Sequence, residues 1–421
     1  MTTTPADIPD LQAGTLTPKE RMVRALTGQK PDRLPAAPAY LSLFLADFER
    51  AFYVEQYRQR LRGRSRYPVD HDEDTLFRAQ AMYQSYGIFK VRPDWIEVHE
   101  CPGRNWAEET EVVEEDSVLY FEDWSTGQRT PMLGKKSSLT DLWDSPTKIR
   151  DRSDIDDHLP VLTAEELLAS GAFDLLRQAV ADYGDRYFAT TILDTPFSEA
   201  YDLLGFQGLM VIQHDQPELF HYLLERKLAQ SKEVMAACAA CGIHGVYAEE
   251  VFTGADLISP RSYDQFVYRY NLPYFHEMRS LGLLPIHYVC GNSIPRLEQM
   301  VEYDVAAVAV EESKKGFQIE IEEVVERVAG RTAVLGNIDA VQFGLHATAD
   351  EMAAEVRRQA AIGARAKGFV VSTGSPFPLD TNPRLIDTLV EAAHSVAGVR
   401  ETTKDTNPAQ LRLGDWQDRK D

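Results

Sequence analysis

From about residue 162 to residue 395, short apolar runs alternate regularly with longer stretches of helical spacing. This repeat narrows the possible folds more than any other part of the sequence. The apolar runs predict strands at 187–193, 245–251, 283–289, 306–310, 332–335 and 368–372. Because parallel strands need a crossover connection, usually a helix, the repeat predicts a parallel sheet covered by helices.

A barrel accommodates this repeat best. With one or two strands from the N-terminal third, such as 34–40, the repeat predicts an α/β chain folded as a (β/α)8 TIM barrel. A doubly wound open sheet is the alternative. It is disfavoured because no glycine-rich phosphate-binding fingerprint follows any predicted strand.

We expect a single barrel domain over 1–421, with a helical N-terminal extension at 1–34. A capping box, Thr-Pro-Lys-Glu from Thr17, opens the helix of this extension. Short alternating runs separated by turn residues predict an antiparallel β meander inserted at 95–133. The polar segment 401–421 predicts a flexible tail.

The net charge argues against two classes of partner, and the cysteine content argues against a disulfide-stabilised protein. A net charge of −22 disfavours nucleic acid and anionic membrane surfaces, which need clustered Lys and Arg. Four cysteines in 421 residues do not make a disulfide scaffold and suit a reducing compartment. The N-terminus lacks the features of a signal peptide, and no apolar run approaches the roughly 20 residues of a membrane span. We therefore expect a cytoplasmic protein.

The predicted strand ends are rich in acids. In a TIM barrel the chemistry lies at the carboxyl ends of the strands. Acids follow four of the six predicted strands: Asp194, Glu249, Glu250, Glu311, Glu312 and Asp339. Such a cluster favours a metal, a proton-transfer role or a cationic substrate, because crowded carboxylates repel one another. Alternatively, several of these acids cap helices or pair with arginines. Neighbours such as Glu249 and Glu250 cannot both point into the barrel.

A second signal is the motif HYVCGN at 287–292, which follows an apolar run. It places His287 and Cys290 near a strand end, and imidazole plus thiolate is a ligand pair that suits zinc. Alternatively, both side chains are only packed in place. Their odd separation allows a shared metal only if the strand ends or bulges between them, which Gly291 would permit.

Five blocks carry a family resemblance. They are ERMVRALTGQKPDRLP at 20–35, GVYAEE at 245–250 with LISPRSY at 257–263, HYVCGN at 287–292, GNID at 336–339 and FVVSTGSPFPLDTNP at 369–383. They resemble, in the same order, the uroporphyrinogen decarboxylase superfamily, which includes cobalamin-dependent methyltransferases. The resemblance covers most of 17–398 and implies a (β/α)8 barrel.

Within that superfamily, the chain resembles the methyltransferase branch more than the true decarboxylases. The decarboxylases carry an arginine-rich block near the first strand, and 34–44 has none, so a polycarboxylate porphyrinogen would bind poorly. The methyltransferase branch typically has a zinc site written His-x-Cys, with a second Cys after the last strand. Here Tyr288 and Ser375 stand at two of those positions. The resemblance thus implies an altered zinc set of His287, Cys290 and a carboxylate from Glu249 or Glu311.

The resemblance implies a corrinoid-linked methyltransferase. It would move a methyl group from a small O-methyl, N-methyl or S-methyl compound to cobalamin on a separate corrinoid protein, since no Asp-x-His-x-x-Gly cobalt motif occurs here. Two sets of residues are assigned by hypothesis. Glu249, Glu311 and Asp339 are the candidate catalytic acids, and Asn292, Asn337 and Ser375 are the candidate cofactor-binding residues.

Two alternatives stay open. One is a metal-free decarboxylase or lyase acting on a small carboxylated substrate. The other is a non-enzymatic partner subunit, which the many strand-end acids argue against. The sequence leaves the oligomeric state open, with a homodimer as one option.

Overall fold

The computed structural model describes residues 16–132 and 149–397. The expected tail at 401–421 and the start of the N-terminal extension lie outside the described residues. No helix in the described ranges combines the length and the apolar character that crossing a membrane requires.

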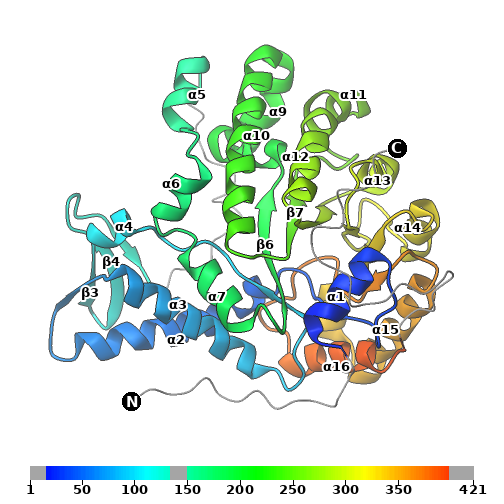
Figure 1. Cartoon of the computed structure of the whole chain (residues 1–421), viewed down its shortest axis with the longest axis horizontal. Coiled ribbons are helices and arrows are strands. Elements are labelled where there is room, and N and C mark those ends of the chain that lie inside the picture. The colour runs from blue at the N-terminus through cyan, green and yellow to red at the C-terminus, as the bar shows by residue number, and fades with distance from the viewer. Residues whose placement is uncertain (1–15, 133–148, 398–421) are drawn as a thin grey trace.

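The centre of the molecule is a parallel sheet, seen in Figure 1 with helices around it. Its strand order is β11-β10-β9-β8-β7-β6-β2. The strands are β2 (Trp95–Glu97), β6 (Phe188–Asp194), β7 (Gly245–Glu250), β8 (Leu284–Val289), β9 (Ala307–Val310), β10 (Ala333–Leu335) and β11 (Phe369–Val370). Six of them match the strands that the apolar runs predict.

The segment around Ala36 closes this sheet into a barrel. Ala36 forms a parallel bridge with Val371, just beyond β11. On its other side, the Asp94 amide donates to the Ala36 carbonyl oxygen at 2.8 Å, just before β2. The prediction of an α/β TIM barrel is therefore confirmed, although the strand expected at 34–40 is reduced to this bridging segment.

Helices connect and cover the strands. The α-helices are α1 (Pro18–Thr27), α2 (Leu41–Leu61), α3 (His71–Ser85), α4 (Arg104–Glu108), α5 (Arg152–His158), α6 (Ala164–Ala169), α7 (Asp174–Tyr183), α8 (Pro196–Glu199), α9 (Tyr201–Asp215), α10 (Pro217–Ala240), α11 (Pro260–Ser262), α12 (Arg269–Ser280), α13 (Leu297–Glu302), α14 (Ile321–Val328), α15 (Ala349–Gly363) and α16 (Pro383–His394). Short 3₁₀ turns are η1 (Tyr86–Ile88) and η4 (Ile294–Arg296), and π-helical turns are η3 (Tyr263–Tyr268) and η5 (Gln342–His346).

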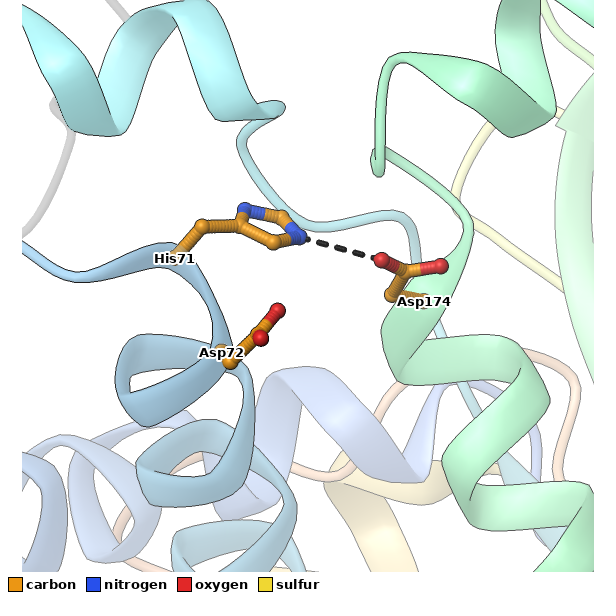
Figure 2. A group of neighbouring side chains, drawn as sticks. All are labelled: His71, Asp72 and Asp174. Atoms are coloured by element: carbon orange, nitrogen blue, oxygen red, sulfur yellow. Dashed lines mark hydrogen bonds and ion pairs between the residues drawn. The ribbon is translucent and has the colours of Figure 1, made fainter.

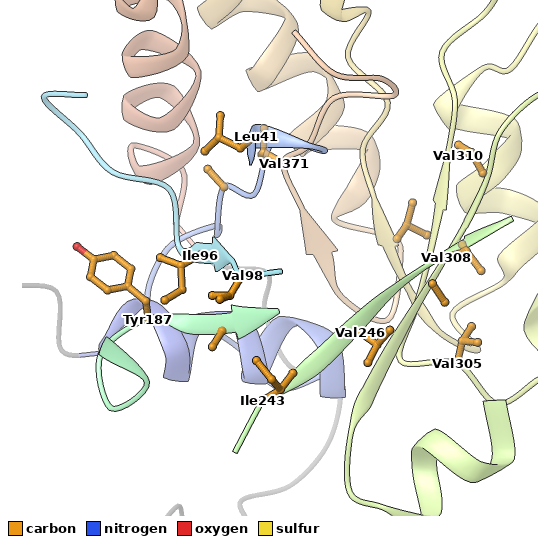
Figure 3. Packing of buried hydrophobic residues seen from close by; sticks show 14 of the residues in the cluster. Leu41, Ile96, Val98, Tyr187, Ile243, Val246, Val305, Val308, Val310 and Val371 are labelled. Carbon is orange, nitrogen blue, oxygen red and sulfur yellow. The ribbon is translucent and has the colours of Figure 1, made fainter. Parts of the chain in front are cut away.

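Side chains that alternate along the strands separate two buried clusters. The outward-facing residues, such as Val246 and Val308, pack against the helices (Figure 3). The inward-facing residues, such as Tyr247, Ile286 and Tyr288, fill the barrel. This alternation fixes which residue at each strand end faces the barrel interior.

Helix α1 closes the end of the barrel at which the strands begin, opposite to the end where their carboxyl termini lie. Its capping box forms as predicted, because the Glu20 amide donates to the Thr17 hydroxyl at 3.1 Å and the Glu20 carboxylate accepts from the Thr17 amide. Arg21, which is 1% exposed, forms ion pairs with Asp32 and with the fully buried Asp94. These ion pairs fix α1 to the barrel.

A small antiparallel sheet lies beside α2 and α3, at the left of Figure 1. Its order is β1 (Arg66–Pro68), β3 (Thr110–Glu115), β4 (Val118–Asp123) and β5 (Arg129–Pro131). It differs from the meander expected at 95–133 in two ways. First, residues 95–97 form the barrel strand β2, although their short alternating pattern resembles that of a meander strand. Second, β1, which lies earlier in the chain, pairs with β3 in the small sheet.

Candidate active site

Glu249 stands at the carboxyl end of β7 and faces the barrel interior. Side chains alternate along β7, so Glu249 faces the same side as Gly245 and Tyr247. Glu250 faces the opposite side and is fully buried. Burial raises the pKa of the half-buried Glu249 carboxyl, and the nearby Tyr40 hydroxyl offsets part of this rise. The position therefore favours a carboxyl group that holds a proton more tightly than usual.

Three tyrosine rings lie around this carboxyl. The Tyr40 ring lies edge-on to Tyr247 and Tyr288, at centroid distances of 5.3 and 5.5 Å. Tyr247 and Tyr288 stack on each other at 5.4 Å. The Glu97 carboxylate, at the end of β2, accepts the first amides of α2, from Leu41 at 3.1 Å and Ser42 at 2.9 Å. Glu97 thereby holds the turn at Tyr40, whose φ is 53°.

Asp194 ends β6 directly beside Glu249, its partner in the strand register. Burial, then the charges of Glu249 and Asp202, raise the pKa of Asp194 to about 7. A carboxyl group with this pKa carries a proton for part of the time at neutral pH. The pair of Asp194 and Glu249 can therefore supply a proton to a bound molecule.

Glu311 follows β9 and lies close to Cys290. Its carboxylate accepts the Gly291 amide at 2.7 Å, and the Cys290 sulfur lies 3.6 Å away. Burial and the charges of Glu311 and Glu249 raise the pKa of the Cys290 thiol to about 12. Cys290 is therefore a protonated thiol at neutral pH rather than a nucleophilic thiolate.

Lys314 is the cation of this region. Its ammonium lies 3.2 Å from the Glu311 carboxylate and also pairs with Glu312. The Ser375 hydroxyl donates to the same Glu312 oxygen at 2.8 Å, while the second oxygen, Oε2, is buried without a hydrogen-bond partner. Gly374 makes this packing possible, since a Cβ there would lie 2.4 Å from Glu312 Oε2.

His287 does not face the barrel interior. It is fully buried against the rings of Phe275 and Tyr303, at centroid distances of 4.7 and 5.5 Å. Its Nε2 donates to the Glu250 carboxylate at 2.9 Å. β8 runs straight through His287 and ends at Val289, so the alternation sends His287 and Cys290 to opposite sides of the barrel wall.

The residues expected to hold zinc therefore do not fit one ion. His287 is engaged by Glu250 on the helix side, whereas Cys290 and Glu249 lie on the interior side. The expectation of a shared site for His287, Cys290 and Glu249 is corrected on this geometry.

Three other expected site residues make contacts that shape loops. The Asn337 side chain donates to the carbonyl oxygens of Glu311 and Ile319, at 3.3 and 3.1 Å. The Asp339 carboxylate caps the turn before η5 by accepting two backbone amides. The backbone amide of Asn292 donates to the Asp256 carboxylate at 3.0 Å. These contacts position the strand-end loops and leave Asp339 a poor candidate for a catalytic acid.

One group of candidate metal ligands lies elsewhere. His71, Asp72 and Asp174 bring ligand atoms within 4.8 Å of one another at the start of α3 and α7 (Figure 2). However, Asp174 already pairs with His71 at 3.2 Å, Arg104 at 2.6 Å and Arg177 at 2.8 Å. Two guanidinium groups compete with any cation here, so we interpret the group as an ion-pair network between two helices.

The sequence did not single out several residues of the site. Tyr40 precedes α2 in a left-handed conformation that its sequence does not signal. Tyr247 lies two residues before Glu249 and faces the same side of its strand, so the alternation of side chains would have identified it. Tyr288, two residues before Cys290, was noted in the sequence only as the residue at an expected zinc-ligand position. Lys314 follows Glu311 and Glu312 closely enough to have suggested an ion pair.

Comparisons with known proteins agree with this fold. The family model for uroporphyrinogen decarboxylase (URO-D) matches residues 145–396. Uroporphyrinogen decarboxylases of Rhodococcus opacus and Xanthomonas euvesicatoria are 26% and 29% identical to the chain. These matches cover 44% and 43% of this chain and 51% of each relative, so the chain spans about half the length of the curated relatives it matches.

A solved structure extends the comparison to nearly the whole chain. A methyltransferase from Methanosarcina mazei superposes with a TM-score of 0.64 at 15% identity, covering 90% of this chain and 99% of that one. At this identity the likeness concerns the fold. Because the family model spans more than half of the chain, the chain belongs to the uroporphyrinogen decarboxylase (URO-D) family, as the sequence resemblance predicted.

Proposed function

We propose that this chain is a methyltransferase, which moves a methyl group from a small methylated compound to a corrinoid carried by a separate protein. The family and the name of the Methanosarcina mazei structure support methyl transfer coarsely. The corrinoid partner follows from the resemblance of the sequence blocks to the cobalamin-dependent branch.

The composition of the strand ends carries this proposal. The first four residues after each of the seven strands include Lys314 but no arginine. The carboxyl groups of this region include those of Asp194, Glu249, Glu311 and Glu312. A porphyrinogen, which carries many carboxylates, would meet repulsion here rather than pairing. A small neutral or cationic molecule suits the same surface.

The chain's own residues would assist departure of the heteroatom that loses its methyl group. When bound, the corrinoid supplies the cobalt that accepts the methyl group. Asp194, with a pKa of about 7, would give a proton to a departing oxygen, whereas the neighbouring Glu249 carboxylate would pair with a donor that carries a positive charge. The tyrosine rings beside Glu249 would exclude water from that proton.

Methyl transfer is tested with the purified chain, reduced cobalamin and a panel of methoxy, methylamine and methylthio compounds. The expected result is methylcobalamin formation, followed by its absorbance, with at least one donor. The same samples are assayed for carbon dioxide release from small carboxylic acids. Carbon dioxide release without methylcobalamin would replace the proposal with its alternative.

That alternative is a decarboxylase or lyase acting on a small carboxylated substrate. It is favoured by one observation, the pair of Asp194 and Glu249, because decarboxylation also needs a proton donor at the carbon that loses carbon dioxide. The surrounding carboxylates weigh against it, since they would repel an anionic substrate.

A further inference from the structure

We infer that the strand-end site binds a small N-methylated ammonium ion that keeps at least one N–H. This inference rests on the proposed function and narrows its donors from O-methyl, N-methyl and S-methyl compounds to one class. Charge, aromatic rings and unpartnered polar atoms each point to it.

The charge of the site is unbalanced. Lys314 is occupied by Glu311 and Glu312. Among the described residues, no Lys, Arg or His forms an ion pair with Glu249, and the adjacent Asp194 adds a second carboxyl group. Glu249 is half-buried, so a small molecule can reach it while little water screens its charge. A cation is the ligand that would relieve this repulsion.

The aromatic rings select the kind of cation. Tyr40, Tyr247 and Tyr288 lie within 5.5 Å of one another by ring centroids and are 6%, 1% and 2% exposed. Tyr247 and Tyr288 cover each other's faces, so Tyr40, the most exposed of the three, is the ring that would contact a methylated ammonium group. Methyl groups also gain from contact with an apolar surface. A metal ion would prefer oxygen ligands without such rings.

Two buried polar atoms make no hydrogen bond of normal geometry. They are the Tyr40 hydroxyl, which lies near Glu249, and Glu312 Oε2. Buried groups in this state lower stability, and a ligand that satisfies them gains affinity. Glu312 Oε2 only accepts, so its natural partner is an N–H. This favours a protonated methylamine over a fully methylated ammonium ion.

Isothermal titration calorimetry tests this inference with the full chain and three probes: trimethylammonium, tetramethylammonium and tert-butanol, which is a neutral molecule of similar shape. We expect trimethylammonium to bind at least about tenfold more tightly than tert-butanol, and more tightly than tetramethylammonium. Equal binding of trimethylammonium and tert-butanol would overturn the inference.

Two variants localise the binding. Glu249→Gln keeps the shape of the side chain and removes its charge, so it should weaken trimethylammonium binding roughly tenfold or more. Glu165→Gln, an exposed position at the start of α6, is the matched control and should bind as the wild type does. Unchanged affinity in Glu249→Gln would also overturn the inference. If that variant does not fold, the comparison of probes on the wild type still decides.

The outcomes separate this inference from the proposed function. Binding of trimethylammonium without any methylcobalamin formation would keep the cation site and remove methyl transfer. Methyl transfer from a methoxy compound without ammonium binding would keep the methyltransferase and remove the cation site.

Discussion

At the scale of single residues, the direction in which each side chain leaves its strand decides whether it can take part in chemistry. The alternation rule correctly separates Glu249 from Glu250 in the sequence alone. It could not place His287, because whether β8 ended before or after this residue depended on the backbone pairing with β7 and β9. The histidine of the most suggestive motif consequently belongs to the packing behind the barrel wall.

This placement makes His287 a stability residue. His287→Ala removes a ring packed against Phe275 and Tyr303 and takes a hydrogen-bond donor from the buried Glu250. We expect the free energy of unfolding to fall by about 3–5 kcal/mol, measured by urea denaturation. Cys290→Ser, in the same motif but half-buried, should change it by less than about 1 kcal/mol.

Measuring the zinc content of the wild type and of His287→Ala tests whether His287 binds a metal instead. A zinc content that is present in the wild type and lost in a stably folded His287→Ala protein would contradict the assignment of His287 to packing.

At the scale of elements, the loops after β9 and β11 depend on a close approach at Gly374. A Cβ at this position would lie 2.3 Å from the Glu312 amide nitrogen and 2.9 Å from the Glu311 carbonyl carbon. Gly374→Ala should therefore shift both carboxylates and cost about 1–3 kcal/mol of stability, seen as a lower Tm. Gly316→Ala is the control in the loop after β9, where nothing lies within 4 Å. Equal Tm values for the two variants would refute this account of the loop contact.

The contact between α1 and the barrel gives a pH-dependent prediction. Burial alone would raise the pKa of Asp94, but His394 and Arg21 hold it below the ordinary value of 3.8. The carboxylate therefore stabilises the fold fully above that value, and its contribution disappears as the pH falls through the lowered pKa.

Asp94→Asn should lower the free energy of unfolding by about 3 kcal/mol at pH 7, because it leaves the buried Arg21 with one carboxylate instead of two. Urea denaturation of variant and wild type from pH 7 to pH 3 should show this difference shrinking below about pH 4. A difference that stays constant over the whole range would mean that the charge of Asp94 is not what stabilises α1.

At the scale of the whole molecule, the periodic βα units made the barrel predictable, because each unit reports locally on a parallel strand. The small sheet was less predictable. The sequence pattern of residues 95–97 is that of a meander strand. Only the parallel pairing of this segment with β6 shows that it belongs to the barrel. The acid-rich character of the strand ends was also predictable, but the rings of Tyr40, Tyr247 and Tyr288 come together only once the barrel has closed.

The functional centre of this protein is proposed to lie at the strand-end carboxyl groups and not at His287 of the HYVCGN motif. The most direct measurement compares methylcobalamin formation by wild type and Glu249→Gln at equal concentrations of folded protein, with Glu165→Gln as control. We expect kcat/KM to fall roughly a hundredfold or more in Glu249→Gln and not to change in Glu165→Gln. A Glu249→Gln enzyme as active as the wild type would contradict the claim.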